Sequence, residues 1–309
     1  GTIPLSEAQF RANIDRCICV DKDKNVFFLV DNDGKFAAFM LNEEADKLIS
    51  LKSDINAMFN SPILGYNSKE GIVYQFWANR DSHDVNYFDP KTDYAPTTAI
   101  SSVSWDDSNF PNIEGFGVWA AKCNFTMGPD GKMYSRMLGG NLVRIDVENA
   151  RGENLTNGDL VGTKDGSAYG LVFDPQDENV FYFSNNDKHC IYKYDLRTKE
   201  WACWAGQEGK SGYLDGPIGQ AMFNKPGQMC VDSEGNIILT DTENHCIRKI
   251  TMSTGYVSTL AGKPQNSGYV NGSAEDAQFK KPLGICIDND DVMYIGDSEN
   301  RAIRRLAVE

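Results

Sequence analysis

The sequence predicts an all-β fold, a six-bladed β-propeller of four-stranded antiparallel blades, and two observations carry the prediction. The first is an internal repeat, in which Phe223 and Arg248 recur as Phe279 and Arg304, each 56 residues later. The second is the pattern inside one repeat, where short apolar runs alternate with turns rich in Asp, Asn, Ser and Gly. A repeat period of this size is typical of propellers and related repeat folds.

The unit from 226 to 262 shows how each repeat is built. None of its apolar runs has the 3.6-residue period of a helix. Four runs predict its strands: 228–231, 237–239, 246–250 and 256–260. Four short antiparallel strands joined by tight turns describe one propeller blade.

Weaker copies of this unit fill the remainder of the chain. Copies begin near residues 170 and 126, a more divergent one begins near residue 63, and one with two extra residues begins near residue 8. Six blades of about 50 residues each therefore occupy residues 1–309 as a single domain. The last copy ends after its third strand, so we expect residues 2–5 to supply the fourth strand, because ring closure removes exposed sheet edges.

The composite pattern of Gly212–Pro217, Ala221–Gly227 and Asp241–Ile250 resembles the NHL repeat. The match is close in the last two units and fair in the one before. Over residues 1–165 it depends mostly on the spacing of strands and turns. The resemblance therefore implies an NHL-like propeller.

The acidic charge, an aromatic-rich loop and the repeat style are similar to secreted or surface NHL-repeat lipoproteins of Bacteroides-type gut bacteria. This resemblance implies an extracellular or cell-surface location and a glycan or surface protein as ligand. It also implies an upstream domain that is absent from this chain. We find no signal peptide or lipid anchor in the chain itself.

Composition excludes some classes of partner. The net charge of −14 would repel a polyanion, so we expect no nucleic acid. No apolar run is long enough to span a membrane. The eight cysteines fall largely at repeat positions where a small apolar residue packs, and no Cys-x-x-Cys motif indicates zinc. We expect a monomer, and the cysteines do not decide the redox compartment.

The segment from 104 to 119 interrupts the repeat spacing and is predicted to be a loop on the face of the strand 2–3 turns. Departures from a repeat are where specialised function is usually inserted. Flat aromatic rings beside Asp and Asn suit sugars, and the alternative is that the rings pack beneath the loops. The candidate ligand-binding residues are Trp105, Asp106, Asp107, Phe110, Asn112, Trp119, Tyr213 and Tyr269.

The three histidines, His83, His189 and His245, are weak candidates for a metal site. His189 and His245 occupy the same repeat position, so a role in stabilising the turn is the favoured explanation for them. The acidic pairs Asp106-Asp107 and Asp81-x-x-Asp84 are of the type that binds calcium, although acidic surface loops are common in a chain of this charge.

These observations favour a non-catalytic binding or scaffold propeller, with its ligand on the face that carries the 104–119 loop. We predict no catalytic residues and no cofactor other than calcium. The alternative is a metal-dependent lyase or hydrolase with its site at the central channel, and a structural spacer without a small ligand is a third class. No matching set of channel histidines is found in the first strands, where such an enzyme would need them.

Overall fold

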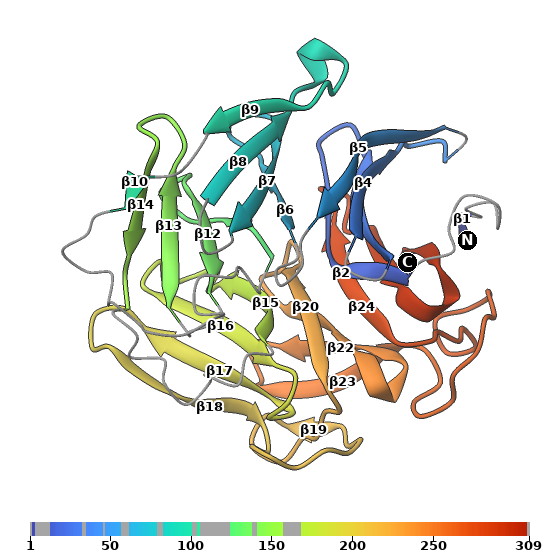
Figure 1. The fold of residues 1–309 in the computed structure, drawn as a ribbon. Coiled ribbons are helices and arrows are strands. Elements are labelled where there is room, and N and C mark those ends of the chain that lie inside the picture. Colours follow the sequence, from blue (N-terminus) through green and yellow to red (C-terminus); the bar gives the residue numbers. More distant parts are fainter. Residues whose placement is uncertain are drawn as a thin grey trace.

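The computed structural model describes residues 2–3, 13–32, 35–45, 47–56, 62–78, 83–100, 104–105, 124–137, 141–156 and 168–307. These residues form six sheets arranged as a ring around a central axis (Figure 1). Each sheet contains four strands in antiparallel order, and two of the sheets gain a short fifth strand. The predicted six-bladed propeller is therefore confirmed.

The blades follow the chain, and the first strand of each is the innermost. Blade 1 contains β2 (Asn13–Val20), β3 (Val26–Asn32), β4 (Lys35–Leu41) and β5 (Leu48–Asn56). Blade 2 contains β6 (Ile63–Asn67), β7 (Ile72–Ala78), β8 (His83–Phe88) and β9 (Thr97–Ile100). Blade 3 contains β11 (Thr126–Met127), β12 (Met133–Arg136), β13 (Leu142–Asp146) and β14 (Arg151–Asn154). Blade 4 contains β15 (Ala168–Phe173), β16 (Val180–Asn185), β17 (Cys190–Asp195) and β18 (Glu200–Gly206). Blade 5 contains β20 (Pro226–Val231), β21 (Ile237–Asp241), β22 (Cys246–Thr251) and β23 (Tyr256–Ala261). Blade 6 contains β24 (Pro282–Ile287), β25 (Met293–Asp297), β26 (Ala302–Leu306) and β1 (Thr2–Ile3).

Asx turns explain why the inner strands reverse where they do. Asp232 follows β20, and its Oδ1 accepts hydrogen bonds from the backbone N–H groups of Glu234 and Asn236 at 3.1 and 2.7 Å. Gly235 supplies the positive φ of 82° that the turn requires. Asp288 makes the same turn after β24, accepting from the backbone of Val292 at 3.0 Å. A short acidic side chain therefore ends each of these strands.

The core consists of apolar layers between neighbouring blades. Phe223 is fully buried against Met229, Leu239 and Val257 of blade 5, in a layer that also contains Tyr182 of blade 4. Phe279 holds the equivalent position between blades 5 and 6 and is 2% exposed. The repeated phenylalanine is therefore an inter-blade residue, as the repeat predicts.

The ring is closed by the two ends of the described chain. Thr2 and Ile3 form β1, which pairs antiparallel with β26 through Arg304 and Ile303. This supplies the outer strand of blade 6 and confirms the expected closure at Thr2–Ile3. Residues 4 and 5, which were expected to extend this strand, lie outside the described residues.

Two short strands add to the outer edges of blades. β10 (Ser104–Trp105) pairs parallel with β14 of blade 3, and β19 (Gly216–Pro217) pairs antiparallel with β23 of blade 5. The segment predicted as a loop from 104 therefore begins as an edge strand. Three short 3-10 helices are described: η1 (Pro90–Thr92), η3 (Thr242–Asn244) and η4 (Ser298–Asn300). In the described part of the chain, no helix is long and apolar enough to cross a bilayer.

Candidate functional site

The charged residues of the repeat hold the blades together from inside. Arg248 on β22 is fully buried and faces two carboxylates. One guanidinium nitrogen donates to Asp241 Oδ2 at 2.6 Å and to the backbone oxygen of Met222 at 3.0 Å. The other donates to Asp215 Oδ1 at 2.8 Å and to the backbone oxygen of Leu214 at 2.9 Å. We call this arrangement the arginine latch, because it fixes the loop before blade 5 onto its third strand.

Blade 6 repeats the latch at the equivalent positions. Arg304 donates to Asp297 Oδ2 at 2.8 Å and to Asn271 Oδ1 at 3.0 Å. Asn300 donates its amide to the same Asp297 oxygen at 2.8 Å, as Asn244 does in blade 5. These repeated residues therefore have a structural role, in which a buried ion pair is combined with the amide contact of the turn.

Aromatic rings enclose each guanidinium. Arg248 lies 4.9 Å from the ring centroid of Tyr213 and 5.1 Å from that of Phe223. Arg304 lies in the same way between Tyr269 and Phe279, at 5.1 and 4.9 Å. Stacking of a buried cation on two rings offsets part of its lost hydration. The two tyrosines predicted to bind ligand thus have a packing role as well.

The two tyrosines differ in how much of the side chain is exposed to solvent. The Tyr213 ring is half-buried, and its hydroxyl shares a hydrogen bond of 2.6 Å with Thr259 Oγ1. Tyr269 is 52% exposed, so one face of its ring is open to a ligand. Of this pair, Tyr269 is the better candidate for stacking against a sugar.

His189 and His245 bridge neighbouring blades. Each has a positive φ, 56° and 57° respectively, at the end of the strand 2–3 turn. The Nδ1 of His189 accepts the backbone N–H of Lys225 at 3.0 Å, and His245 does the same with Lys281 at 3.1 Å. Burial lowers the pKa of both imidazoles. Both histidines therefore make a structural contact, which joins neighbouring blades instead of closing the turn itself.

Most of the predicted 104–119 site cannot be placed. Trp105 lies in β10 at the outer edge of blade 3, but its side chain is outside the described residues. The same holds for the side chain of His83, which begins β8. Within the described ranges, no three His, Cys, Asp or Glu side chains gather to hold a metal ion. The predicted residues that lie wholly outside the described ranges are Asp81, Asp106, Asp107, Phe110, Asn112 and Trp119.

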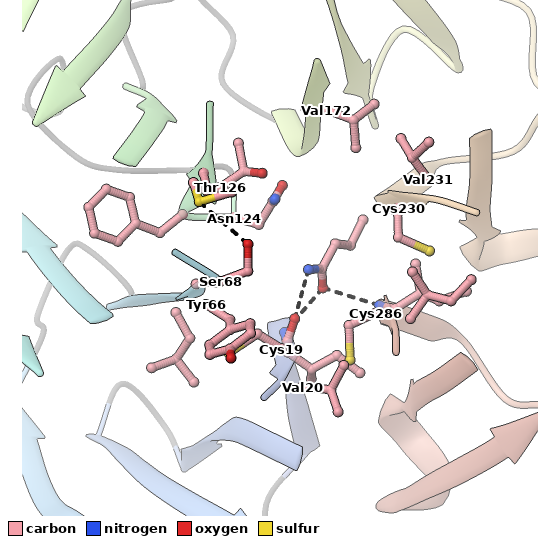
Figure 2. Close-up of a pocket in the computed structure, with 18 of the residues that line it drawn as sticks. Cys19, Val20, Tyr66, Ser68, Asn124, Thr126, Val172, Cys230, Val231 and Cys286 are labelled. Atoms are coloured by element: carbon pink, nitrogen blue, oxygen red, sulfur yellow. Dashed lines mark hydrogen bonds between the residues drawn. The ribbon is translucent and has the colours of Figure 1, made fainter. Parts of the chain in front are cut away.

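The described residues enclose a pocket of about 400 Å³ at the central channel. It is lined by the carboxyl-terminal ends of the inner strands and by the strand 1–2 turns that follow them. It therefore opens on the face opposite to the one that carries the strand 2–3 turns. Figure 2 shows side chains from several blades around it, among them Tyr66, Ser68, Asn124, Thr126 and Cys286.

Two buried amides join the inner strands beside this pocket. Gln228 Oε1 accepts the backbone N–H groups of Ile18 and Ile285, both at 3.1 Å, and its Nε2 donates to the backbone oxygen of Ile18 at 2.9 Å. Asn124 exchanges two hydrogen bonds with the backbone of Leu171, at 2.7 and 3.1 Å. The inner strands of neighbouring blades belong to different sheets and do not pair with each other, so these amide hydrogen bonds connect them instead.

Three thiols from three blades line the same pocket. Cys19, Cys230 and Cys286 belong to blades 1, 5 and 6. Burial raises the pKa of all three, so they are neutral thiols near neutral pH. The hydroxyls of Tyr66, Ser68 and Thr126 and the side chains of Asp21, Lys22 and Asp288 also line the pocket. Such a lining suits a small polar ligand that forms hydrogen bonds.

The sequence did not reveal this pocket. Its polar contributors, such as Ser68 and Asn124, stand at positions that differ from blade to blade, so no periodic motif marks them. The one repeated signal was the cysteine two residues before the turn aspartate, at Cys230 and Cys286. That position had been interpreted as ordinary packing.

Comparison with known proteins supports the repeat assignment. Residues 223–250 match the NHL repeat family. The Arabidopsis thaliana protein SUPPRESSOR OF QUENCHING 1, chloroplastic, is 25% identical over 271 residues, which is 81% of this chain and 25% of that protein. NHL repeat-containing protein 2 of Gallus gallus is 30% identical over 152 residues, covering 48% of this chain and 19% of that protein. The chain thus spans a quarter or less of the length of these relatives.

Solved structures share the fold over the whole chain. A protein of unknown function from Bacteroides thetaiotaomicron superposes with a TM-score of 0.77 at 22% identity, covering 100% of this chain and 72% of that one. An auxiliary nutrient binding protein from the same organism gives a TM-score of 0.70 at 21% identity, with coverage of 96% and 69%. Virginiamycin B lyase from Staphylococcus aureus, as an inactive variant with quinupristin, gives 0.59 at 13% identity, with coverage of 100% and 99%. At these identities the likeness concerns the fold alone.

Proposed function

The chain is an NHL-repeat β-propeller, and from that premise we propose that it is a non-catalytic binding module for a glycan fragment taken up as a nutrient. The observation that carries the proposal is the channel pocket. It opens on one face of the ring and is about 400 Å³ in volume. Its lining combines hydroxyl, amide and neutral thiol groups with the carboxyl groups of Asp21 and Asp288 and the amine of Lys22. A pocket of this size and polarity suits one or two sugar rings.

The neighbouring structures support the same class of function. Two of them are auxiliary nutrient binding proteins, one from Bacteroides thetaiotaomicron and one from Bacteroides ovatus. We infer from this a location at the cell surface, where such a ligand would be captured. We propose a glycan because the hydroxyl and amide groups of the pocket can form hydrogen bonds with sugar hydroxyls.

The binding proposal is favoured over the enzymatic alternative by where the histidines lie. His189 and His245 use their Nδ1 atoms to hold the next blade, and burial lowers the pKa of each. A channel metal would need such side chains to converge on the axis. Metal analysis of the purified protein, together with an assay for lyase activity, tests this alternative directly.

Two positions for the ligand follow from the chain, and blocking variants separate them. Ser68 is exposed beside the mouth of the pocket, so Ser68→Trp should obstruct it without disturbing the core. Trp105→Ala and Tyr269→Ala remove candidate rings on the predicted loop face instead. Ser253→Trp adds the same bulk at an exposed turn of blade 5 that does not line the pocket, which makes it the matched control.

The first measurement is a glycan array of the wild-type protein, with and without calcium. Selective binding that Ser68→Trp reduces ~10-fold or more, and that Ser253→Trp leaves intact, supports the pocket. Loss in Trp105→Ala or Tyr269→Ala alone moves the site to the loop face. A blank array overturns the proposal of a glycan module, and binding that survives every variant overturns both proposed positions of its site.

A further inference from the structure

Blade 4 carries two cysteines on facing strands. Cys190 begins β17, and Cys203 lies in β18 directly opposite Tyr192. Because alternate residues of a strand share a face, Cys190, Tyr192 and Cys203 lie on the same side of the blade. Cys190 and Cys203 also pack into the same apolar cluster. The two cysteines are thus diagonal neighbours, a relation in which side chains can interact across strands.

The two thiols affect each other's pKa in opposite directions. The neighbouring Cys190 lowers the pKa of Cys203, whereas Cys203 and burial raise that of Cys190. The Cys203 thiol itself donates a hydrogen bond to the backbone oxygen of Gly206 at 3.6 Å. A backbone hydrogen bond from Glu208 further favours the Cys203 thiolate, while the Glu208 carboxylate opposes it. That carboxylate accepts the Tyr192 hydroxyl at 2.8 Å, which offsets part of its effect. Cys203 is therefore the member of the pair more ready to ionise.

The two cysteines also differ in solvent exposure, and Cys203 is the more exposed of them. Cys190 is fully buried, whereas Cys203 is half-buried. Cys230 provides a comparison within the same chain, because it is also half-buried. Its pKa is raised by burial and by Asp232 and Asp291. Of these two half-buried thiols, Cys203 alone is favoured as a nucleophile.

We propose that Cys203 and Cys190 are a reversible thiol–disulfide pair that reacts with low-molecular-weight disulfides, with Cys203 as the attacking thiol and Cys190 as the resolving thiol. The inference is independent of the proposed glycan binding, because blade 4 contributes these residues from strands away from the channel pocket.

The exchange proceeds in two steps that conserve atoms and electrons. The Cys203 thiolate attacks one sulfur of the small disulfide, whose S–S bond breaks, and one small thiolate leaves and takes up a proton. Cys190 then loses its proton and attacks Cys203 Sγ, which releases the second small thiol. Two protein thiols are oxidised to one disulfide, and the small disulfide is reduced to two thiols. A small dithiol reverses the reaction.

The product would join β17 to β18, the outer pair of strands in blade 4. In blade 5 the position of Cys203 is taken by Thr259, whose hydroxyl contacts the Asp215 carboxylate at 3.1 Å. In blade 4 a disulfide bond would therefore form at the position where blade 5 has the hydrogen bond between Thr259 and Asp215.

The test is exchange with oxidised glutathione near neutral pH, followed by alkylation of the remaining thiols and peptide mass spectrometry. Trypsin cuts after Lys193 and Lys199, so the two cysteines separate into peptides 189–193 and 200–210. We expect these peptides to become linked by a disulfide, and the link to disappear after treatment with dithiothreitol. Cys203 should also be alkylated ~10-fold faster than Cys230.

Single substitutions identify the order of attack. Cys190→Ser should stop the reaction at a glutathione adduct on Cys203, and Cys203→Ser should leave Cys190 unmodified. Cys230→Ser is the matched control and should form the 189–193 to 200–210 link as the wild type does. Failure of the linked peptide to form in the wild type and in Cys230→Ser, with unchanged melting curves, overturns the proposal. So does equal alkylation of Cys203 and Cys230.

Discussion

Blades 5 and 4 are built from the same four-strand pattern, yet they hold their outer halves by different chemistry. In blade 5 the side chain opposite the fourth strand is Arg248, which forms a fully buried ion pair with Asp241. In blade 4 the equivalent positions are Tyr192 and Asn185, and Tyr192 instead donates its hydroxyl to Glu208. The comparison teaches that the fold needs a latch at this position but does not prescribe a charged one.

The presence of Tyr192 at the position of Arg248 changes the chemical surroundings in blade 4. Arg248 donates four hydrogen bonds, two to carboxylates and two to backbone oxygens. Tyr192 instead lies in an apolar cluster with Cys190 and Cys203. Blade 4 therefore carries a thiol, Cys203, at the position where blade 5 has the hydroxyl of Thr259.

The largest expected effect comes from breaking the latch in blade 5. Arg248→Ala should lower the free energy of unfolding by about 3–5 kcal/mol, because Asp241 is left buried without its counter-ion. Chemical denaturation followed by tryptophan fluorescence measures the change. Lys249→Ala is the control, since its ion pair with Asp232 is partly exposed and should be worth less than ~1 kcal/mol. Equal effects of the two substitutions would show that the latch is dispensable.

A smaller effect is expected from the corresponding change in blade 4. Tyr192→Phe removes only the hydroxyl that Glu208 accepts, so we expect a loss of about 1 kcal/mol in the same denaturation assay. Tyr256→Phe, at a residue that is 47% exposed, should change nothing measurable. If Tyr192→Phe costs as much as Arg248→Ala, the two latches are equivalent and the comparison fails.

The smallest effect concerns the histidines that both blades share. Burial lowers the pKa of His189 and His245 in the folded protein, and their Nδ1 atoms must stay unprotonated to accept a backbone N–H. The unfolded chain, with a pKa of about 6.5, then binds the proton more tightly. Stability contributed by these groups is present above that pH and lost as the pH falls below it.

Urea denaturation at about pH 7.5 and about pH 5.5 measures this loss on either side of the unfolded pKa. The contribution of each histidine should stay under ~1 kcal/mol, because the imidazoles are partly exposed to solvent. His189→Asn keeps an acceptor, tolerates the positive φ and does not titrate, so it should reduce the difference between the two pH values. An unchanged difference would count against the histidine assignment.

The fold could be predicted because it depends on features that recur. The apolar runs and turn aspartates of blades 5 and 6 repeat at a fixed spacing, and Phe223 is buried where that spacing requires. The pairing of Thr2–Ile3 with β26 followed from the missing fourth strand alone. Periodic hydrophobicity and turn chemistry are local properties, which a sequence displays directly.

The channel pocket could not be predicted because nothing about it is periodic. Gln228 joins β20 to Ile18, 210 residues away in the chain, and only the closed ring brings these atoms together. The latch could be predicted only in part, because Asp241 belongs to the repeated pattern of turn residues, whereas the sequence does not show that Arg248 is buried beside it. Burial of a charged group depends on tertiary contacts that strand spacing does not reveal.

The closing strand also bears on how the molecule forms. β1 precedes every other described strand in the chain, and it pairs with β26, the last of them, with Thr2 opposite Arg304. Few contacts in a protein span so much sequence, and contacts of such separation form slowly because the loop-closure entropy must be lost first. Until they form, β26 presents an open sheet edge. The interval between synthesis of the last blade and docking of β1 is therefore the time when the chain is most exposed to pairing with another copy of itself.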